Sequence, residues 1–231
     1  MKTDSSLIVT PDSSLLSGVI CLIRNHFGEV TSPRDDDPIR DAFEHHFQAS
    51  GKQMRASLSL DASQALRLDS HTAQCLAACV EALHNASLVL DDFQDSALER
   101  RGHPTVCALF GRDVALGLTL RLTTTAFVSL SQIKNVEHLG SLTMEVHQAV
   151  ADTILGQTWD QDDTKNEAVE QVKLTASMKS GPLFGLSVSL PLLAAGHKDV
   201  LETARRLGKL FGLGYQALDD LKDRATDRLQ A

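Results

Sequence analysis

Two groups of acidic residues are the clearest candidates for a catalytic or metal-binding role in this sequence. Each group places aspartates at positions i, i+1 and i+4 directly after an apolar segment. The six residues are Asp91, Asp92, Asp95, Asp219, Asp220 and Asp223. On a helix, residues i and i+4 lie one above the other about 6 Å apart, so each group would present a carboxylate pair on one face.

Paired carboxylates repel one another unless a cation neutralises them. Mg²⁺ does this with one or two carboxylates and completes its shell with substrate phosphate oxygens. A solvated acidic helix face would explain one such group equally well. The second copy favours a metal site, as does the apolar segment before each group, because a helix that is apolar nearly all round is buried and ends at a cavity mouth. Two such groups facing each other across a bundle would hold a metal-bridged diphosphate.

Helical periodicity dominates the elements that must position these acids. Apolar residues recur at three- and four-residue steps over 13–27, 71–101, 138–161 and 166–181. Prolines suited to a first helical turn follow Thr10, Asp37 and His103. We expect loops at 31–38, 110–113, 160–166 and 195–199. With 42% hydrophobic and only 4% aromatic residues, the 231-residue chain is expected to fold as one all-α domain, a bundle of many helices.

The composition excludes several classes of partner. The chain has 22 Lys and Arg against 30 Asp and Glu, a formal net charge of -8. This negative charge disfavours binding to nucleic acid. Any anionic ligand must therefore be bound by a local basic pocket or through metal ions. No uninterrupted apolar stretch is long enough for a transmembrane segment, and the first 18 residues do not resemble a signal peptide. Of the four cysteines, Cys75 and Cys79 are one helical turn apart, and we expect buried free thiols. The protein is expected to be cytoplasmic.

The motifs, taken in order, resemble those of the trans-isoprenyl diphosphate synthases, the polyprenyl synthetase family. "LVLDDFQDSALERRGHPT" (88–105) is similar to the first aspartate-rich motif of the family, and "GYQALDDLKD" (214–223) is similar to the second. "GKQMR" (51–55), "GQTWD" (156–160) and "MKSGPLF" (178–184) match three further family motifs, and His84 precedes the first acid by seven residues. The resemblance extends from about residue 40 to the end of the sequence.

The resemblance implies an isoprenoid-synthase-type bundle around a central apolar cavity and a Mg²⁺-dependent prenyltransferase that works as a homodimer. An allylic diphosphate would ionise and be attacked by the double bond of isopentenyl diphosphate. Metal ions and fixed cations would stabilise the departing diphosphate, and an apolar cavity would shield the carbocation from water.

The same resemblance implies residue roles. Asp91 and Asp95 would bind Mg²⁺ from one side and Asp219 from the other. The supporting or water-mediated ligands would be Asp92, Asp220 and Asp223. The allylic diphosphate would be bound by Arg100, Lys179 and Gln216. Isopentenyl diphosphate, which carries no metal, would be bound by Lys52, Arg55, His84 and Arg101, since it needs a cationic cluster of its own. The pair His45 and His46 reads as a surface feature beside Glu44.

Chain length is set in this family by residues just before the first acidic motif. Here these residues are Ala86 and Ser87. Neither has an aromatic side chain that would block growth of the prenyl chain, so we expect a product of C20 or longer. The sequence ends at Ala231, eight residues after Asp223. Because the resemblance implies further helices after the second acidic motif, we expect either a naturally short member of the family or a sequence that stops before the rest of the protein. Leu118 and Thr119 also depart from the usual Gly-Asp of the family.

Two other interpretations remain open at this stage. A class I terpene cyclase shares the bundle and the first acidic motif, but its second metal-binding motif carries an Asn/Ser/Glu pattern. In "DDLKD", by contrast, all three candidate metal ligands are aspartates. A non-catalytic subunit of a heteromeric synthase would typically lose one or both acidic motifs, and this chain keeps both.

Overall fold

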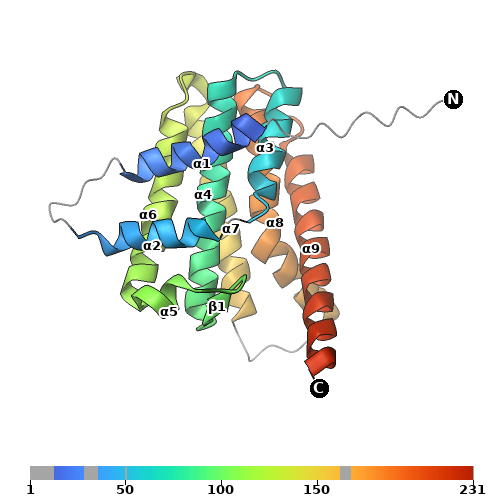
Figure 1. The fold of residues 1–231 in the computed structure, drawn as a ribbon. Coiled ribbons are helices and arrows are strands. Elements are labelled where there is room, and N and C mark those ends of the chain that lie inside the picture. The colour runs from blue at the N-terminus through green and yellow to red at the C-terminus, as the bar shows by residue number, and fades with distance from the viewer. Residues whose placement is uncertain (1–12, 29–35, 50, 162–167, 231) are drawn as a thin grey trace. The chain divides into compact units, whose positions relative to one another are not determined.

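The structure is a computed structural model, and it is almost entirely helical (Figure 1). It describes residues 13–28, 36–49, 51–161 and 168–230, apart from the side chains of 13, 136, 219, 220 and 222–230. Within these residues, nine α-helices are accompanied by a single two-stranded hairpin. The predicted all-α class is therefore confirmed.

The chain divides into two compact units, Met1–Val136 and Glu137–Ala231, and each is described by itself. The first unit contains six helices and the hairpin: α1 (Ser13–Gly28), α2 (Pro38–Gln48), α3 (Met54–Ala65), α4 (Ser70–Gln94), β1 (Glu99–Arg100), β2 (His103–Pro104), α5 (Val106–Phe110) and α6 (Arg112–Ser131). A 3-10 turn, η1 (Val136–His138), precedes the helices of the second unit: α7 (Leu139–Asp160), α8 (Val169–Ala194) and α9 (Leu201–Gln230). The expectation of a single domain stays a prediction.

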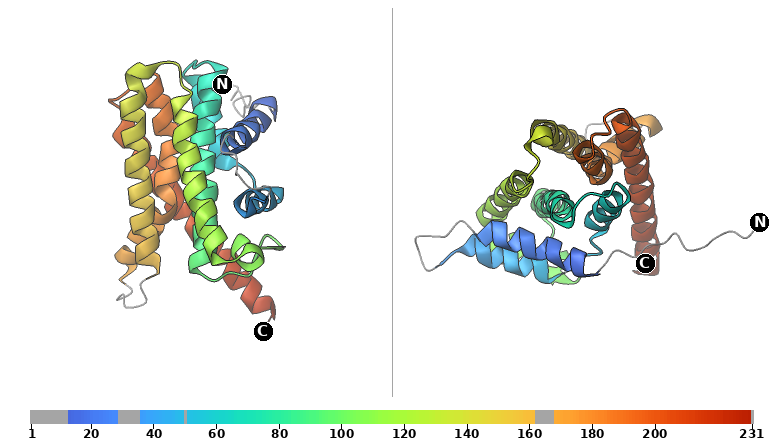
Figure 2. Two further views of the ribbon diagram at one scale, coloured as in Figure 1. Left: turned by 90° about the vertical axis from the view of Figure 1, so that its left-hand side faces the viewer. Right: turned by 90° about the horizontal axis from the view of Figure 1, so that it is seen from above.

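Helix α4 is the central element of the first unit. It packs against α1, α3, α5 and α6, and Figure 2 shows α4 running beside α6. Its middle is buried on nearly all sides by small and aliphatic residues, including the fully buried Leu76 and Val80. Cys75 and Cys79 are buried free thiols, as predicted, whereas the free thiol of Cys21 is exposed. Burial raises the pKa of Cys75 to about 11, so this thiol stays protonated at neutral pH.

Side-chain caps fix where several helices begin. Asp37 accepts hydrogen bonds from the backbone N–H groups of Ile39 and Arg40, both at 3.1 Å, which confirms the helix start predicted at Asp37-Pro38. Asp69 caps α4 by accepting from the Thr72 backbone N–H at 3.0 Å. The start predicted at Thr10-Pro11 lies outside the described residues.

The predicted helix over 71–101 is wrong at its C-terminal end. Helix α4 ends at Gln94, and the chain then turns into the antiparallel hairpin, in which Arg100 pairs with His103. The two residues between them, Arg101 and Gly102, have φ values of 55° and 77°, as a tight two-residue hairpin turn requires. The helix start predicted at His103-Pro104 is wrong as well, because these residues form β2 and Thr105 caps α5 instead.

Glycines allow a close approach of α8 and α9 in the second unit. A Cβ added at Gly208 would lie 2.3 Å from the backbone nitrogen of Gly185, and one added at Gly212 would lie 2.4 Å from that of Gly181. Helix α8 continues well past the predicted residue 181 to Ala194, with Pro182 within it.

Two helices, α4 and α6, are long and apolar enough to cross a membrane by length and composition alone. The buried share of the most apolar window is 67% in α4 and 44% in α6. Core helices of soluble proteins pass the same test, so this is weak evidence for a membrane span. The expected absence of a transmembrane segment stays a prediction.

Candidate functional site

The hairpin brings Arg100 back onto the acidic end of α4. Its Nε donates to both carboxylate oxygens of Asp92, at 2.9 and 3.0 Å, and its Nη2 donates to Oδ2 of Asp91 at 3.2 Å. Burial raises the pKa of the Asp92 carboxyl, and the adjacent Arg100 guanidinium opposes that rise. One guanidinium thus joins the first two acids of the motif, which fixes the position of Arg100 relative to both carboxylates.

Asp95 follows one turn after Asp91, at the C-cap of α4. Its backbone N–H donates to the Asp91 carbonyl at 2.9 Å, so the helical spacing predicted for this pair is retained. Helix α9 runs without a break through Asp219, Asp220 and Asp223, although their side chains lie outside the described ones. Gln216 is half-buried on the same helix.

A basic cluster lies beside the first motif and contains three of the predicted residues. Arg55 is buried, and its Nη1 donates to Nε2 of His84 at 3.2 Å. Burial holds the pKa of His84 well below its usual range, and the charges of Arg55 and Arg101 lower it further. Arg55 is therefore in direct contact with His84, and the charge of Arg101 acts on the same imidazole.

Arg101 and the "GKQMR" segment meet at Gly51. The Nη1 of Arg101 donates to the Ala49 carbonyl at 3.3 Å, and a Cβ added at Gly51 would lie 2.6 Å from that same nitrogen. A larger residue at this position would require the guanidinium of Arg101 to move. Lys52 follows directly and is exposed.

A chain of buried polar side chains, not predicted as part of the site, supports the basic cluster. The amide of Asn85 donates to the backbone carbonyl of Glu81 at 2.8 Å and to its Oε1 at 3.2 Å. This leaves Oδ1 of Asn85 to accept from Nε2 of His46 at 2.9 Å. Burial raises the pKa of Glu81, and the charge of Arg55 opposes this rise. In the sequence, Glu81 and Asn85 flank His84 in "EALHNAS", but the contact with His46 is not readable from spacing.

His45 and His46 are not a surface pair, contrary to the interpretation of the sequence. Nε2 of His45 donates to the Pro104 carbonyl at 2.8 Å, which ties α2 to the hairpin. Burial lowers the pKa of His46 to about 4, with contributions from the charges of Arg100 and Arg101.

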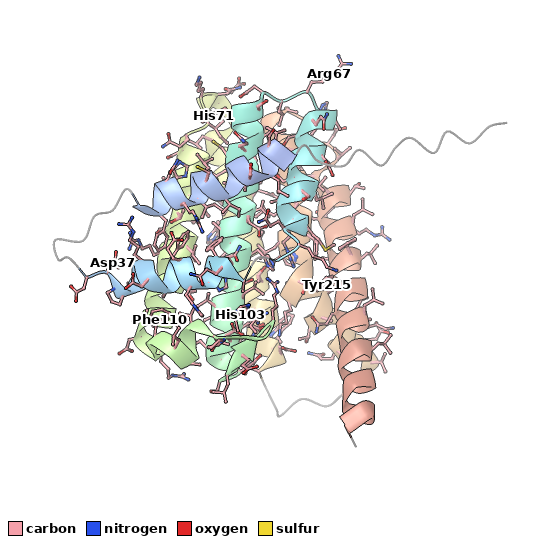
Figure 3. All side chains as sticks on the ribbon, viewed as in Figure 1. Asp37, Arg67, His71, His103, Phe110 and Tyr215 are labelled. Atoms are coloured by element: carbon pink, nitrogen blue, oxygen red, sulfur yellow. The ribbon has the colours of Figure 1, made fainter. Side chains whose placement is uncertain are left out.

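These elements form an open pocket between α2, the end of α4 and the hairpin. It is lined by His45, His46, Ala49, Asp92, Arg100, Arg101, His103, Pro104, Thr105 and Val106. His103, labelled in Figure 3, lies on the hairpin beside this pocket. The lining combines two guanidinium groups, three imidazoles and one carboxylate, a composition suited to an anion of high charge.

The residues expected to set chain length lie on α4 just before the acids. Ala86 is buried, and Ser87 is half-buried with its hydroxyl donating to the His84 carbonyl at 2.7 Å. Both side chains are small.

Two predicted motifs meet in the second unit. Nζ of Lys179 donates to Oδ2 of Asp160 at 2.7 Å, which joins "MKSGPLF" to "GQTWD". Gly156 makes this approach possible, because a Cβ there would lie 2.4 Å from the backbone carbon of Met178. Arg205 on α9 forms a two-point ion pair with the buried Glu145 on α7.

Among the described side chains, no group of three or more His, Cys, Asp or Glu residues is arranged to hold a metal ion. The structure brings Asp91, Asp92, Arg100, Arg101, Arg55 and His84 together within the first unit. It brings Lys179 together with Asp160 within the second. The roles assigned to these residues are proposals.

Comparison with known proteins identifies relatives over most of the chain. A family model described as polyprenyl synthetase matches residues 36–230. A geranylgeranyl pyrophosphate synthase from Geoglobus acetivorans is 29% identical over 213 residues, which are 87% of this chain and 65% of the relative. A (2E,6E)-farnesyl diphosphate synthase from Mycobacterium tuberculosis is 33% identical over 178 residues, covering 74% of this chain and 48% of the relative.

Solved structures give the same result for the fold. The crystal structure of a geranyltranstransferase from Thermotoga maritima is similar with a TM-score of 0.79 and 27% identity, covering 91% of this chain and 79% of that one. The chain spans about half to two thirds of the length of the curated relatives named above.

Proposed function

The chain belongs to the polyprenyl synthetase family, and on this premise we propose that it is a Mg²⁺-dependent prenyltransferase. It condenses an allylic diphosphate with isopentenyl diphosphate to give a longer trans-prenyl diphosphate, with C20 or longer favoured. The observation that carries this proposal is the convergence of Arg55, His84 and Arg101 beside the acids that Arg100 joins. Such a site offers one diphosphate a metal-binding face and the other a purely cationic one.

The donor set at the end of α4 fits Mg²⁺, because it consists of carboxylate oxygens one helical turn apart. Asp91 and Asp95 would hold the metal from this side and Asp219 from α9, supported by Asp92, Asp220 and Asp223. Bound Mg²⁺ supplies charge neutralisation for the departing diphosphate.

The side chains of the protein do the remaining work. Arg100, Lys179 and Gln216 orient the allylic diphosphate, so that its C–O bond breaks with the electron pair leaving on the diphosphate oxygen. Isopentenyl diphosphate is held at Lys52, Arg55, His84 and Arg101. Its double bond then forms the new C–C bond to the allylic carbon, and the resulting cation loses a proton to the released diphosphate, which leaves a new double bond in the product. The apolar surface of α4 before Asp91 excludes water from the cation.

The length of the product depends on the space above Ser87 and Ala86. The names of the relatives include farnesyl, geranylgeranyl and nonaprenyl diphosphate synthases, so they do not decide the length. The small side chains at both positions favour C20 or longer. Ser87→Phe tests this best, since Ser87 is half-buried, whereas Phe at the buried Ala86 would overpack the core at a cost of about 1–3 kcal/mol. We expect Ser87→Phe to shorten the product, and an unchanged product distribution would contradict the assignment.

Product analysis tests the proposal as a whole. The purified chain is incubated with isopentenyl diphosphate and, separately, with dimethylallyl, geranyl or farnesyl diphosphate, in Mg²⁺ or in EDTA. We expect Mg²⁺-dependent elongation that disappears in Asp91→Ala and Asp219→Ala. Cyclised hydrocarbon formed without isopentenyl diphosphate would instead identify a terpene cyclase. Diphosphate binding without any product would indicate a subunit that needs a partner.

Assembly and location are proposed on the family relationship alone. We propose a cytoplasmic homodimer, for which sedimentation would give twice the 25.0 kDa mass of one chain.

A further inference from the structure

His46 has a position in the pocket that its sequence context did not suggest. It lines the same pocket as Arg100 and Arg101, and the charges of both arginines act on its ring. Of the two ring nitrogens, Nε2 is engaged by Oδ1 of Asn85. Nδ1 is therefore the nitrogen that remains for a ligand.

The hydrogen-bond chain behind His46 fixes which nitrogen carries the proton. The amide nitrogen of Asn85 donates to Glu81 twice, so the amide cannot be flipped without losing both contacts. Its oxygen must then accept, and Nε2 of His46 must donate. A neutral His46 consequently has a bare Nδ1, which can donate to a ligand only after the ring takes up a second proton.

We propose that His46 is a further diphosphate-binding residue of this pocket, held in place by Asn85 and Glu81, and that it becomes a cationic donor when the metal-free diphosphate binds. This inference rests on the proposed function, since it adds a ligand to the isopentenyl diphosphate site. Asn85 and Glu81 act through His46 and are positioning residues.

The charges around His46 explain why it would respond to the ligand. The titratable and charged groups that surround it are His45 on α2, Glu81 (through Asn85), His84 and Asp92 on α4, and Arg100, Arg101 and His103 on the hairpin. This surrounding is dominated by positive charge, which together with burial keeps the ring neutral. A diphosphate reverses the local charge, and an opposite charge within hydrogen-bonding reach raises a histidine pKa by about 1 to 3 pH units.

Proton NMR on the full-length chain tests the inference directly. The ring resonance of His46, identified by its loss in His46→Gln, is titrated over pH in EDTA, with and without inorganic pyrophosphate. Without pyrophosphate we expect a midpoint near 4. With it we expect the midpoint to rise by about 1 to 3 pH units. Pyrophosphate that binds by calorimetry while the midpoint stays unchanged would overturn the inference.

Steady-state kinetics provides an independent readout. We expect His46→Gln to raise KM for isopentenyl diphosphate about tenfold, the loss of one charge-assisted hydrogen bond, with KM for the allylic substrate unchanged. His71→Gln is the matched control, because His71 lies at the start of α4, contacts the Gln132 carbonyl and is not part of the pocket (Figure 3).

The outcomes separate this inference from the proposed function. Wild-type elongation with an unchanged KM in His46→Gln would overturn the role of His46 and leave the prenyltransferase proposal standing. Absence of both pyrophosphate binding and elongation in the wild type would overturn both.

Discussion

Arg100 and Arg101 are adjacent in the sequence, yet they have different partners. Arg100 contacts the carboxylates of Asp91 and Asp92, whereas Arg101 lies against Gly51 and the Ala49 carbonyl. The two directions result from the tight turn that begins at Arg101. At the scale of single residues, this divergence is what would allow two diphosphates to be bound side by side.

Replacing each arginine by lysine should separate the two binding modes. Lysine keeps the charge but loses the fork geometry that lets one group bridge two oxygens. We expect Arg100→Lys to raise KM for the allylic diphosphate about tenfold and Arg101→Lys to raise KM for isopentenyl diphosphate by a similar factor. Each variant is the control for the other, and equal effects of both variants on both substrates would contradict the assignment.

The neutral histidines of the site should make stability depend on pH. The pKa of His46 is about 4 in the folded protein and 6.5 ordinarily, so the unfolded chain binds more protons between these values. Stability is therefore complete above pH 6.5 and is lost as the pH falls toward 4. His84 acts in the same direction.

Urea unfolding measures this pH dependence. From His46 alone, we expect the free energy of unfolding to fall by about 1.6 kcal/mol between pH 6.5 and pH 5. His46→Gln should flatten the slope over this window, and an unchanged slope would contradict the buried, neutral state of the ring.

At the scale of elements, the end of α4 shows where sequence reasoning succeeded and where it failed. The helix and its two acids at one-turn spacing were predictable from periodicity. The hairpin was not, because "DSALERR" continues an apparent helical pattern while the positive φ values of Ser96, Arg101 and Gly102 redirect the backbone. The contact between His46 and Asn85 joins residues 39 positions apart, and no spacing rule indicates such a pair.

The packing of α8 against α9 depends on glycines that lie directly against backbone atoms of the neighbouring helix. In Gly208→Ala, the new Cβ would meet backbone atoms of Gly185 at 2.3 and 2.4 Å. We expect a loss of about 2–3 kcal/mol in the free energy of unfolding, measured by urea denaturation. Gly214→Ala on the same helix is the matched control, because nothing lies within 4 Å of its added Cβ.

That control should gain about 0.5–1 kcal/mol from the better helix propensity of alanine. A Gly208→Ala variant as stable as Gly214→Ala would show that α8 and α9 do not approach each other this closely.

At the scale of the whole molecule, the chain is acidic overall, whereas the candidate site is locally basic. A chain of net charge -8 attracts polyphosphates only where its cations are concentrated. The first unit provides such a place at Arg55, Arg100 and Arg101, and the second unit carries Lys179 and the aspartates of α9. Membership of the polyprenyl synthetase family was recognisable from motif order, because those motifs are short and local.

Binding calorimetry is the most direct test of the claim that one diphosphate is bound by cations alone and the other through metal. Isopentenyl diphosphate and a non-hydrolysable geranyl thiodiphosphate are each titrated into the wild-type chain, once in Mg²⁺ and once in EDTA. We expect isopentenyl diphosphate to bind about equally well in both, and the allylic analogue to bind only in Mg²⁺. Loss of isopentenyl diphosphate binding in EDTA, or equal binding of the allylic analogue without metal, would contradict the account.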